Sequence, residues 1–354
     1  MRAARFHKLS VASIDELTHE SVRVTFDIPT ELEATYVHIP GQHVVVKASI
    51  GGETVRRSYS ICSRAGAASL QIGIKHLPGG AFSSFANTEL TVGDVVEVTP
   101  PTGEFTIETD PSNRRHYIAI VAGSGITPVL SMVESVLADE PDSRFTLVYG
   151  NKDGSSIMFL DDLDRLKNNN LHRFVIFNIL SRESNAIPIL EGRLDEDKLV
   201  QLLTTVVDAA SGTDWYLCGP GGMVEAARSV LTRGGVLPVN IHDELFYAGG
   251  EASPRVAVDD EVGSTIKVTI DGRTSTLVVD PDGAPILDHV LAVRPEAPFS
   301  CRSGACASCR ARVTVGEIRM DKNWSLEEPE LAAGQILTCQ SHPVSETVEL
   351  TYDL

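Results

Sequence analysis

The sequence lacks any run of about 18 or more apolar residues, so we expect no transmembrane helix. Its first residues, MRAARFHKLSVASIDEL, lack the apolar core that a secretory signal peptide needs, which favours a cytoplasmic protein. Cysteine is scarce as well. Six cysteines in 354 residues do not fit the disulfide framework of a small secreted scaffold.

Basic residues are also in short supply. The chain has 30 Lys and Arg against 48 Asp and Glu, a formal net charge of −18. A nucleic-acid surface needs clustered Lys and Arg to neutralise phosphates, so we expect no nucleic-acid partner. We expect no membrane partner either, and no internal repeat is visible.

The length indicates two or three domains, and the residue patterns indicate three. Residues 1–110 contain short β-branched runs (SVRVTFDI, HVVVKASI, SLQIGIKH, DVVEVTPP and EFTIETD) between turn signals, which is typical of an antiparallel barrel or sandwich. Residues 111–248 alternate apolar strands with helical segments, which predicts an α/β domain with a parallel sheet. Residues 249–263 are rich in Gly, Ser, Pro and acid and resemble a linker. Residues 264–354 begin with a hairpin turning at Asp271-Gly272, followed by a short helix around PILDHVLAV.

Four of the cysteines lie near the C-terminus in the order C-x4-C-x2-C plus a distant fourth: Cys301, Cys306, Cys309 and Cys339. This spacing is typical of a plant-type 2Fe-2S cluster, for which thiolates are suitable soft ligands. Small residues around them would let backbone N–H groups approach the sulfides. A structural zinc site is the weaker alternative, because it usually pairs two short knuckles.

Two glycine-rich turns follow apolar strands in the middle segment. The first, VAGSGITP, contains Gly123, Ser124 and Gly125, with Thr127 expected as the N-cap of a helix and Pro128 as its first residue. It is not the dinucleotide fingerprint G-x-G-x-x-G, because Pro128 holds the sixth position. The second turn, LCGPGGM, places Cys218 and Gly219 at the same carboxyl edge of a parallel sheet, where ligands bind.

A third segment, RRSYSICS, combines a cation, an aromatic ring and a hydroxyl group on one strand and precedes GGAFSSF. A barrel that binds a flat aromatic phosphate would use such a set. Taken alone, the segment can also be interpreted as the exposed basic end of a strand with a tyrosine in the core.

Together these segments resemble a known family. Arg57-Ser58-Tyr59-Ser60, GGAFSS, GSGITP, CGPGGM and the closing HDELF, in this order, are similar to the ferredoxin-NADP reductase superfamily. With a ferredoxin domain at the C-terminal end, the chain resembles reductase components of bacterial oxygenases, above all those of phenylacetyl-CoA epoxidases and 3-ketosteroid 9α-hydroxylases. The resemblance covers essentially the whole length. It implies an antiparallel β-barrel for the flavin, an α/β nucleotide domain and an α+β β-grasp ferredoxin domain.

The resemblance also implies residue roles. Arg57 would hold the FAD phosphates, Tyr59 would stack on the isoalloxazine ring and Ser60 would lie near its N5 atom. Ser60 and Cys218 would orient the reactants, although a strand hydroxyl and a small buried thiol remain alternatives, and Glu244 would lie near the flavin face. The other residues predicted to bind FAD or the nicotinamide coenzyme are Ser58, Lys75, Gly80, Ala81, Phe82, Ser83, Gly123, Ser124, Gly125, Thr127, Pro128, Arg182, Gly219 and Phe246. Ala307 stands where many ferredoxin loops carry Gly, and we expect no loss of the cluster.

A nicotinamide gives up two electrons as hydride, whereas a 2Fe-2S cluster accepts one, so a flavin is required between them. We therefore expect electrons to pass from NAD(P)H through FAD and the cluster to a separate oxygenase. Ser181 and Arg182 favour NADPH over NADH, because Arg suits a 2′-phosphate. The expected oxygenase is a di-iron enzyme like phenylacetyl-CoA epoxidase. Alternatives are a Rieske steroid or aromatic-ring oxygenase, a hybrid-cluster or haem acceptor, and a redox-sensing binding protein.

Overall fold

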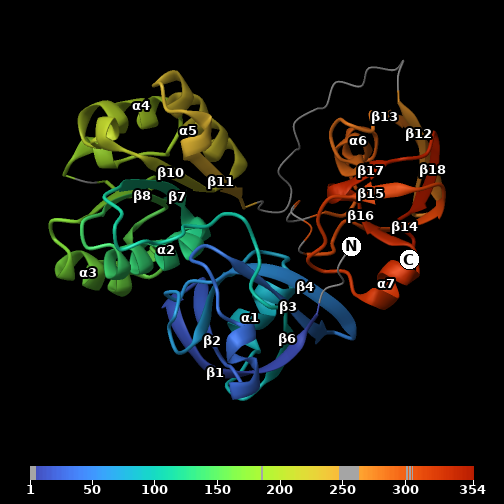
Figure 1. The fold of residues 1–354 in the computed structure, drawn as a ribbon, viewed down its shortest axis with the longest axis horizontal. Coiled ribbons are helices and arrows are strands. Elements are labelled where there is room, and N and C mark those ends of the chain that lie inside the picture. The colour runs from blue at the N-terminus through green and yellow to red at the C-terminus, as the bar shows by residue number, and fades with distance from the viewer. Residues whose placement is uncertain (1–4, 185, 247–262, 300–301, 303, 305) are drawn as a thin grey trace.

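The computed structural model describes residues 5–184, 186–246, 263–299, 302, 304 and 306–354. These residues form three sheet-based domains, coloured from blue through green to red along the chain (Figure 1). The predicted linker, apart from Gly263, and Cys301 lie outside the described residues. The exact domain boundaries stay predictions.

The first domain is a six-stranded antiparallel sheet in the order β4-β3-β6-β1-β2-β5. A bridge between Ile61 and Ile72 joins the end of β4 to β5, so the sheet closes into the predicted barrel. Its elements are β1 (His7–Thr18), β2 (Ser21–Asp27), β3 (His43–Ile50), β4 (Glu53–Ser60), β5 (Leu70–Lys75), helix α1 (Ala81–Thr88) and β6 (Val95–Val98).

The prediction of a strand over EFTIETD, residues 104–110, is wrong. Phe105 and Ile107 alternate as in a strand, but their buried side chains join the core of the second domain. The ring of Phe105 meets that of Tyr216 edge-on at 5.6 Å, and the Tyr216 hydroxyl donates to the carbonyl of Thr106 at 3.3 Å. The alternation therefore reflects packing between domains rather than pairing in a sheet.

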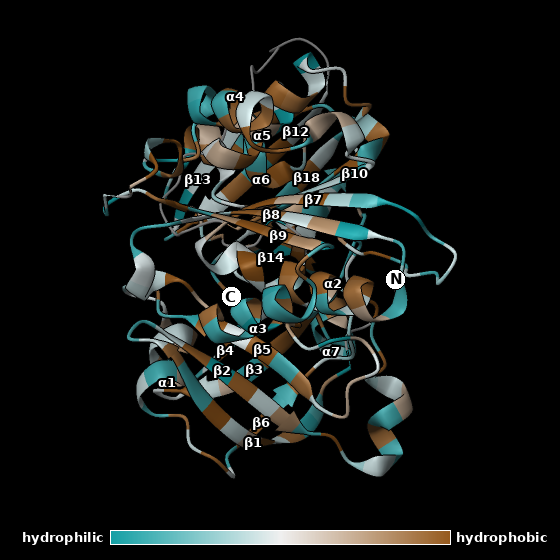
Figure 2. Ribbon diagram, turned by 90° about the vertical axis from the view of Figure 1, so that its left-hand side faces the viewer, coloured by the Kyte–Doolittle hydropathy of each residue, from teal (hydrophilic) through white to brown (hydrophobic). Residues whose placement is uncertain are grey.

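The second domain has the predicted parallel sheet, in the order β11-β10-β7-β8-β9. Helices α2 (Ile126–Asp139) and α3 (Leu160–Asn169) pack on one face, and α4 (Glu196–Thr205) and α5 (Gly221–Arg233) pack on the other. Burial on both faces explains why the strands are apolar runs, largely brown in Figure 2. They are β7 (His116–Ala122), β8 (Arg144–Asn151), β9 (Phe174–Leu180), β10 (Asp214–Gly219) and β11 (Ile241–Leu245).

The third domain is a mixed sheet in the order β13-β12-β18-β14-β16, with helix α6 packed on it, which is the predicted β-grasp arrangement. The predicted hairpin is confirmed, with Asp271 and Gly272 at φ 49° and 68° in its tight turn. Its elements are β12 (Ser264–Ile270), β13 (Arg273–Val279), α6 (Ile286–Val293), β14 (Arg310–Val315), β15 (Ile318–Met320), α7 (Glu328–Ala332), β16 (Gln335–Leu337), β17 (Ser341–Pro343) and β18 (Thr347–Thr351).

None of the helices in the described part of the chain is both long and apolar enough to cross a bilayer.

Candidate functional site

The first group of residues predicted to hold a flavin, Arg57 to Ser60, lies on β4, which pairs with β3 in a hairpin. Arg57 and Tyr59 are half-buried, while Ser60 is buried and pairs with His43 across the hairpin. The Tyr59 ring lies 5.5 Å from the ring of Phe82, which itself is buried in the barrel core. Phe82 could therefore contribute to an anion site only through its backbone N–H.

Helix α1 begins directly after Gly80 and offers backbone N–H groups to an anion. Among the described residues, no side chain caps this helix, so its first N–H groups remain available for a phosphate. The Ser83 hydroxyl instead holds the preceding turn together, because Ser83 Oγ accepts from the Leu77 N–H at 3.1 Å. The segment from Gly80 to Ser83 thus fits a pyrophosphate.

The first glycine-rich turn differs in detail from the prediction. Helix α2 begins at Ile126, so the prediction of Thr127 as its N-cap is wrong. Thr127 lies inside the first turn, where its hydroxyl donates to the Ser124 carbonyl at 2.9 Å. The prediction of Pro128 as the first helical residue is wrong too, because Pro128 is the third residue of α2, still in the first turn, where an N–H is not needed. Gly123 has φ +54°, and the buried Tyr149 fixes it by donating to its carbonyl at 2.9 Å.

The two glycine-rich turns touch at Gly125. A Cβ atom at this position would lie 2.2 Å from the carbonyl oxygen of Cys218, so only glycine fits without moving the backbone. The N–H of Phe246 donates to the Gly219 carbonyl at 3.0 Å, which ties the closing segment to the same place. The structure therefore brings Gly125, Cys218, Gly219 and Phe246 together.

Lys75 of the barrel reaches the first turn from the other side. Its ammonium nitrogen lies about 4.0 Å from the position of a Cβ at Gly123 and 4.0 Å from the Glu20 carboxylate. Lys152 lies 3.5 Å from the same carboxylate. Burial, followed by the charge of Lys152, lowers the pKa of Lys75. Two cations beside a turn of backbone N–H groups suit the phosphates of a dinucleotide.

Between the barrel and the parallel sheet, Ser60, Cys218 and Glu244 come together around a residue that sequence reasoning missed, His43. His43 Nδ1 lies 3.9 Å from Glu244 Oε1, too far for a hydrogen bond, and Glu244 stands beside Cys218 in the sheet. Among the described residues, His43 Nε2 and Glu244 Oε2 are buried without a hydrogen-bond partner. Buried polar atoms of this kind fit a polar ligand at this point.

Burial controls the protonation of this group. It raises the pKa of Glu244 to about 7 and lowers the pKa of His43 to about 4, so His43 is neutral at pH 7. Burial and the Glu244 carboxylate raise the pKa of the Cys218 thiol, which therefore stays protonated. Glu244 is thus the group here that exchanges a proton near neutral pH.

The sequence does contain a signal for His43. HVVVKASI and ETVRRSYS flank Gly51-Gly52, and a two-residue turn there pairs Ile50 with Glu53 and hence His43 with Ser60, as observed. The contact with Glu244 depends on how two domains pack, so no local pattern reveals it.

Arg182 lies away from this group, after β9, on an open hollow of about 440 Å³. Its backbone N–H donates to the Lys152 carbonyl at 2.7 Å, which fixes the turn. Glu183 lines the same hollow, and its carboxylate accepts from the Gly154 N–H at 2.7 Å. An arginine suits the 2′-phosphate of NADPH, whereas a carboxylate suits the 2′-hydroxyl of NADH. Arg182 therefore favours NADPH, and Glu183 favours NADH.

The cysteine loop packs against the segment that carries Cys339. Cys306, Cys309 and Cys339 are buried, and the Thr338 hydroxyl donates to the Cys309 carbonyl at 3.0 Å. Gln340 Nε2 donates to the Arg302 carbonyl at 2.8 Å and so holds the start of the loop. The N–H of Ser308 points at Cys306 Sγ at 3.5 Å, as expected around thiolate ligands.

Cys301 lies outside the described residues, and among the described ones no three His, Cys, Asp or Glu side chains form a metal-binding group. The set of four cysteine ligands therefore stays a prediction from their spacing.

Comparisons with known proteins identify the three domains that carry these candidate sites. Family models match an oxidoreductase FAD-binding domain over residues 8–107, an oxidoreductase NAD-binding domain over 119–229 and a 2Fe-2S iron-sulfur cluster binding domain over 268–344. These matches confirm the predicted cofactor classes: FAD, a nicotinamide coenzyme and a 2Fe-2S cluster.

Two relatives that match over nearly the whole chain are named as components of an epoxidase and of a monooxygenase. The chain is 36% identical to one subunit of the 1,2-phenylacetyl-CoA epoxidase of Escherichia coli K12, with 98% of each chain covered. It is 32% identical to the ferredoxin reductase component of 3-ketosteroid-9-alpha-monooxygenase from Mycobacterium tuberculosis, covering 98% of this chain and 96% of that one.

A solved structure shares the fold over the whole chain. Phthalate dioxygenase reductase matches with a TM-score of 0.54 at 22% identity, and 98% of each chain is covered. The chain belongs to the family of NAD(P)H-dependent oxygenase reductase components, which join an FAD-binding barrel, an NAD-binding α/β domain and a 2Fe-2S ferredoxin domain.

Proposed function

We propose that this reductase takes electrons from NADPH and delivers them to a separate di-iron monooxygenase that epoxidises phenylacetyl-CoA. The observation that carries the choice of partner is the 36% identity to the epoxidase component over 98% of both chains. A Rieske steroid oxygenase is the second candidate, because the 32% identical mycobacterial relative is named for steroid hydroxylation. The cytoplasm is the proposed compartment, since a cluster held by four thiolates favours a reducing environment.

In this proposal the chain's residues bind and orient the cofactors. Arg57 and the first turn of α1 would hold the FAD phosphates, with Tyr59 against the ring system. Lys75 and the Gly123–Gly125 turn would hold the phosphates of the coenzyme, and Cys301, Cys306, Cys309 and Cys339 would hold the cluster. When bound, these groups supply hydride donation, conversion to single electrons and single-electron delivery.

The chemistry of the side chains fits orienting roles rather than nucleophilic ones. Cys218 keeps its proton because burial raises the pKa of its thiol, so it would shape the nicotinamide site without attacking. Ser60 is a buried hydroxyl on the flavin side. Glu244 would hold a proton on its carboxyl group near pH 7.

Reconstitution tests the proposed partner. The purified reductase, carrying FAD and its cluster, is mixed with NADPH and either a phenylacetyl-CoA epoxidase or a steroid-hydroxylating Rieske oxygenase. We expect NADPH consumption coupled to epoxide formation. Steroid hydroxylation at a higher rate than epoxidation would refute the proposed partner and favour the second candidate.

The coenzyme preference is tested with Arg182→Ala. We expect kcat/KM for NADPH to fall about tenfold, the equivalent of one lost charged hydrogen bond, while the value for NADH stays the same. Arg114→Ala, an exposed arginine before β7 at the opposite end of the sheet, is the matched control. A preference that Arg182→Ala leaves unchanged would show that this arginine does not read the 2′-phosphate.

A further inference from the structure

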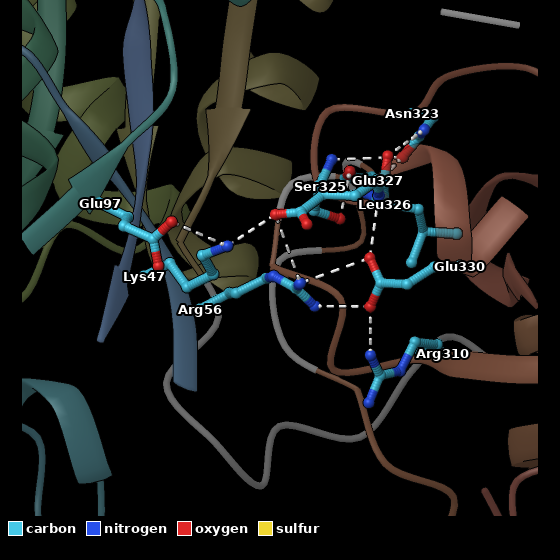
Figure 3. Close-up of polar contacts among 10 residues, drawn as sticks. Lys47, Arg56, Glu97, Arg310, Asn323, Ser325, Leu326, Glu327 and Glu330 are labelled. Carbon is cyan, nitrogen blue, oxygen red and sulfur yellow. Dashed lines mark hydrogen bonds and ion pairs between the residues drawn. The ribbon is translucent and has the colours of Figure 1, made fainter. Parts of the chain in front are cut away.

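Strand β4 of the flavin barrel is joined to helix α7 of the ferredoxin domain, 274 residues further along the chain, by a two-pronged ion pair (Figure 3). Arg56 donates from its two terminal nitrogens to the two carboxylate oxygens of Glu330, at 2.9 and 3.3 Å. Bidentate pairs of this kind fix orientation as well as distance.

A second pair strengthens the contact. Lys47 of β3 lies 2.6 Å from Glu327 and 3.2 Å from Glu97, and the Phe6 ring lies 4.3 Å from its ammonium nitrogen. Only 11% of the Lys47 side chain and 9% of that of Arg56 are exposed. Cations this deeply covered need their carboxylate partners, because an unpaired buried charge is strongly unfavourable.

Glu330 also connects this contact to the cysteine loop. It lies 2.5 Å from Arg310, the residue that directly follows Cys309 (Figure 3). We call the six side chains the interdomain ion network: Lys47, Arg56, Glu97, Arg310, Glu327 and Glu330. They carry three positive and three negative charges, so the network is balanced.

The flavin side of the network is close to the predicted flavin residues. Arg57, the neighbour of Arg56 on β4, approaches the Ser308 hydroxyl at 3.5 Å. Ser308 lies between Cys306 and Cys309 in the loop. Strand β4 therefore carries Arg57, a predicted flavin-binding residue next to the loop, and directly before it Arg56, which pairs with Glu330.

We propose that Glu330 is a positioning residue that holds the cysteine loop of the ferredoxin domain against strand β4 through the interdomain ion network. Because Glu330 joins Arg56 to Arg310, its charge sets the separation between the flavin side and the loop. The inference rests on the proposed internal path of electrons, not on the identity of the oxygenase.

The substitution Glu330→Gln removes the negative charge of this side chain and keeps its size. The backbone N–H of Glu327 donates to Glu330 Oε2 at 2.8 Å within the capping box of α7, and a glutamine can keep this bond. Glu328→Gln is the matched control, since Glu328 is exposed on the same helix and forms no ion pair with any described residue. Lys47→Gln tests the network from the barrel side.

Two measurements on the protein carrying FAD and its cluster test the proposal. Small-angle X-ray scattering at 150 mM NaCl reports docking, and we expect a larger radius of gyration for Glu330→Gln and Lys47→Gln than for the wild type and Glu328→Gln. Anaerobic stopped-flow absorbance separates flavin reduction by NADPH from cluster reduction. We expect cluster reduction to slow about tenfold in Glu330→Gln, while flavin reduction stays within about twofold.

An unchanged radius of gyration in both network variants would overturn the proposal, and so would wild-type cluster reduction in an expanded Glu330→Gln. These outcomes do not depend on the acceptor. A chain that docks as expected but fails to support epoxidation refutes the proposed partner and leaves the positioning role standing.

Discussion

Glu244 and Cys218 occupy neighbouring strands at the carboxyl edge of the parallel sheet, and burial shifts the pKa of both side chains upward. Their residue types alone indicate neither shift. The nearby His43 is shifted in the opposite direction, because burial disfavours the charged form of an acid and of a base alike. At the scale of residues, burial keeps His43 and Cys218 neutral at pH 7 and brings the ionisation of Glu244 close to this pH.

The first prediction concerns the pH dependence of stability. Burial raises the pKa of Glu244 from about 4.5 to about 7, so between these values the folded protein binds more protons at this site than the unfolded chain. Because burial penalises the charged carboxylate, the folded state is favoured most below pH 4.5, where Glu244 is protonated. This contribution to the free energy of unfolding is lost as the pH rises through about 7. His43 acts in the opposite sense, so the difference between wild type and Glu244→Gln isolates the carboxyl group.

We expect the melting temperature of the wild type, relative to Glu244→Gln, to fall as the pH rises from 5 to 7.5, measured by thermal unfolding at several pH values. Glu53→Gln, at the exposed start of β4, reports the effect of losing a surface carboxylate. A difference that stays constant over this range would show that Glu244 is not protonated in the folded protein at pH 5 to 6.

The second prediction concerns Ala307 in the cysteine loop, which adopts φ +54°. The left-handed conformation costs a residue with a Cβ about 1–2 kcal/mol in the folded state. Replacing alanine by glycine makes the unfolded chain more flexible, which lowers the free energy of unfolding by about 0.4–1 kcal/mol. Ala307→Gly should therefore stabilise the ferredoxin domain by about 0.5–1 kcal/mol, measured by denaturant unfolding. Ala332→Gly, at an exposed position in α7, should destabilise it; a loss of stability in both variants would contradict the prediction.

At the scale of elements, two strand-turn-helix units, β7 with α2 and β10 with α5, contact each other through their turns at one edge of the sheet. The turn after β7 and the turn after β10 are in contact because Gly125 has no Cβ, so the N-termini of α2 and α5 lie at the same edge of the sheet. The sequence patterns GSGITP and CGPGGM predict both turns separately. Their contact depends on β7 and β10 being neighbours in the sheet, which strand order decides.

The third prediction follows from this contact. Gly125→Ala would push a methyl group against the Cys218 backbone, which cannot rotate away as a side chain can, so the turn must shift. We expect a loss of about 1–3 kcal/mol in stability, as for other overpacked sites, and at least tenfold weaker NADPH binding in fluorescence titrations. Gly222→Ala, whose Cβ would meet open space at the start of α5, is the control and should be neutral or stabilising.

At the scale of the whole molecule, local patterns predict elements well and contacts between domains poorly. The Asp271-Gly272 hairpin and the alternation of strands and helices in the second domain follow from turn chemistry and periodicity. EFTIETD alternates like a strand, yet Phe105 and Ile107 cover the neighbouring domain. Likewise Arg56 and Glu330 are ordinary surface residues in sequence and become partners only because two domains dock.

The central claim is that one chain carries electrons from a nicotinamide through a flavin to its own cluster. Anaerobic titration of the purified, cofactor-loaded protein with NADPH, followed by absorbance and by the paramagnetic signal of the reduced cluster, tests it most directly. We predict uptake of about three electrons per chain, two at the flavin and one at the cluster. Uptake of about two electrons with a cluster that stays oxidised would contradict the account.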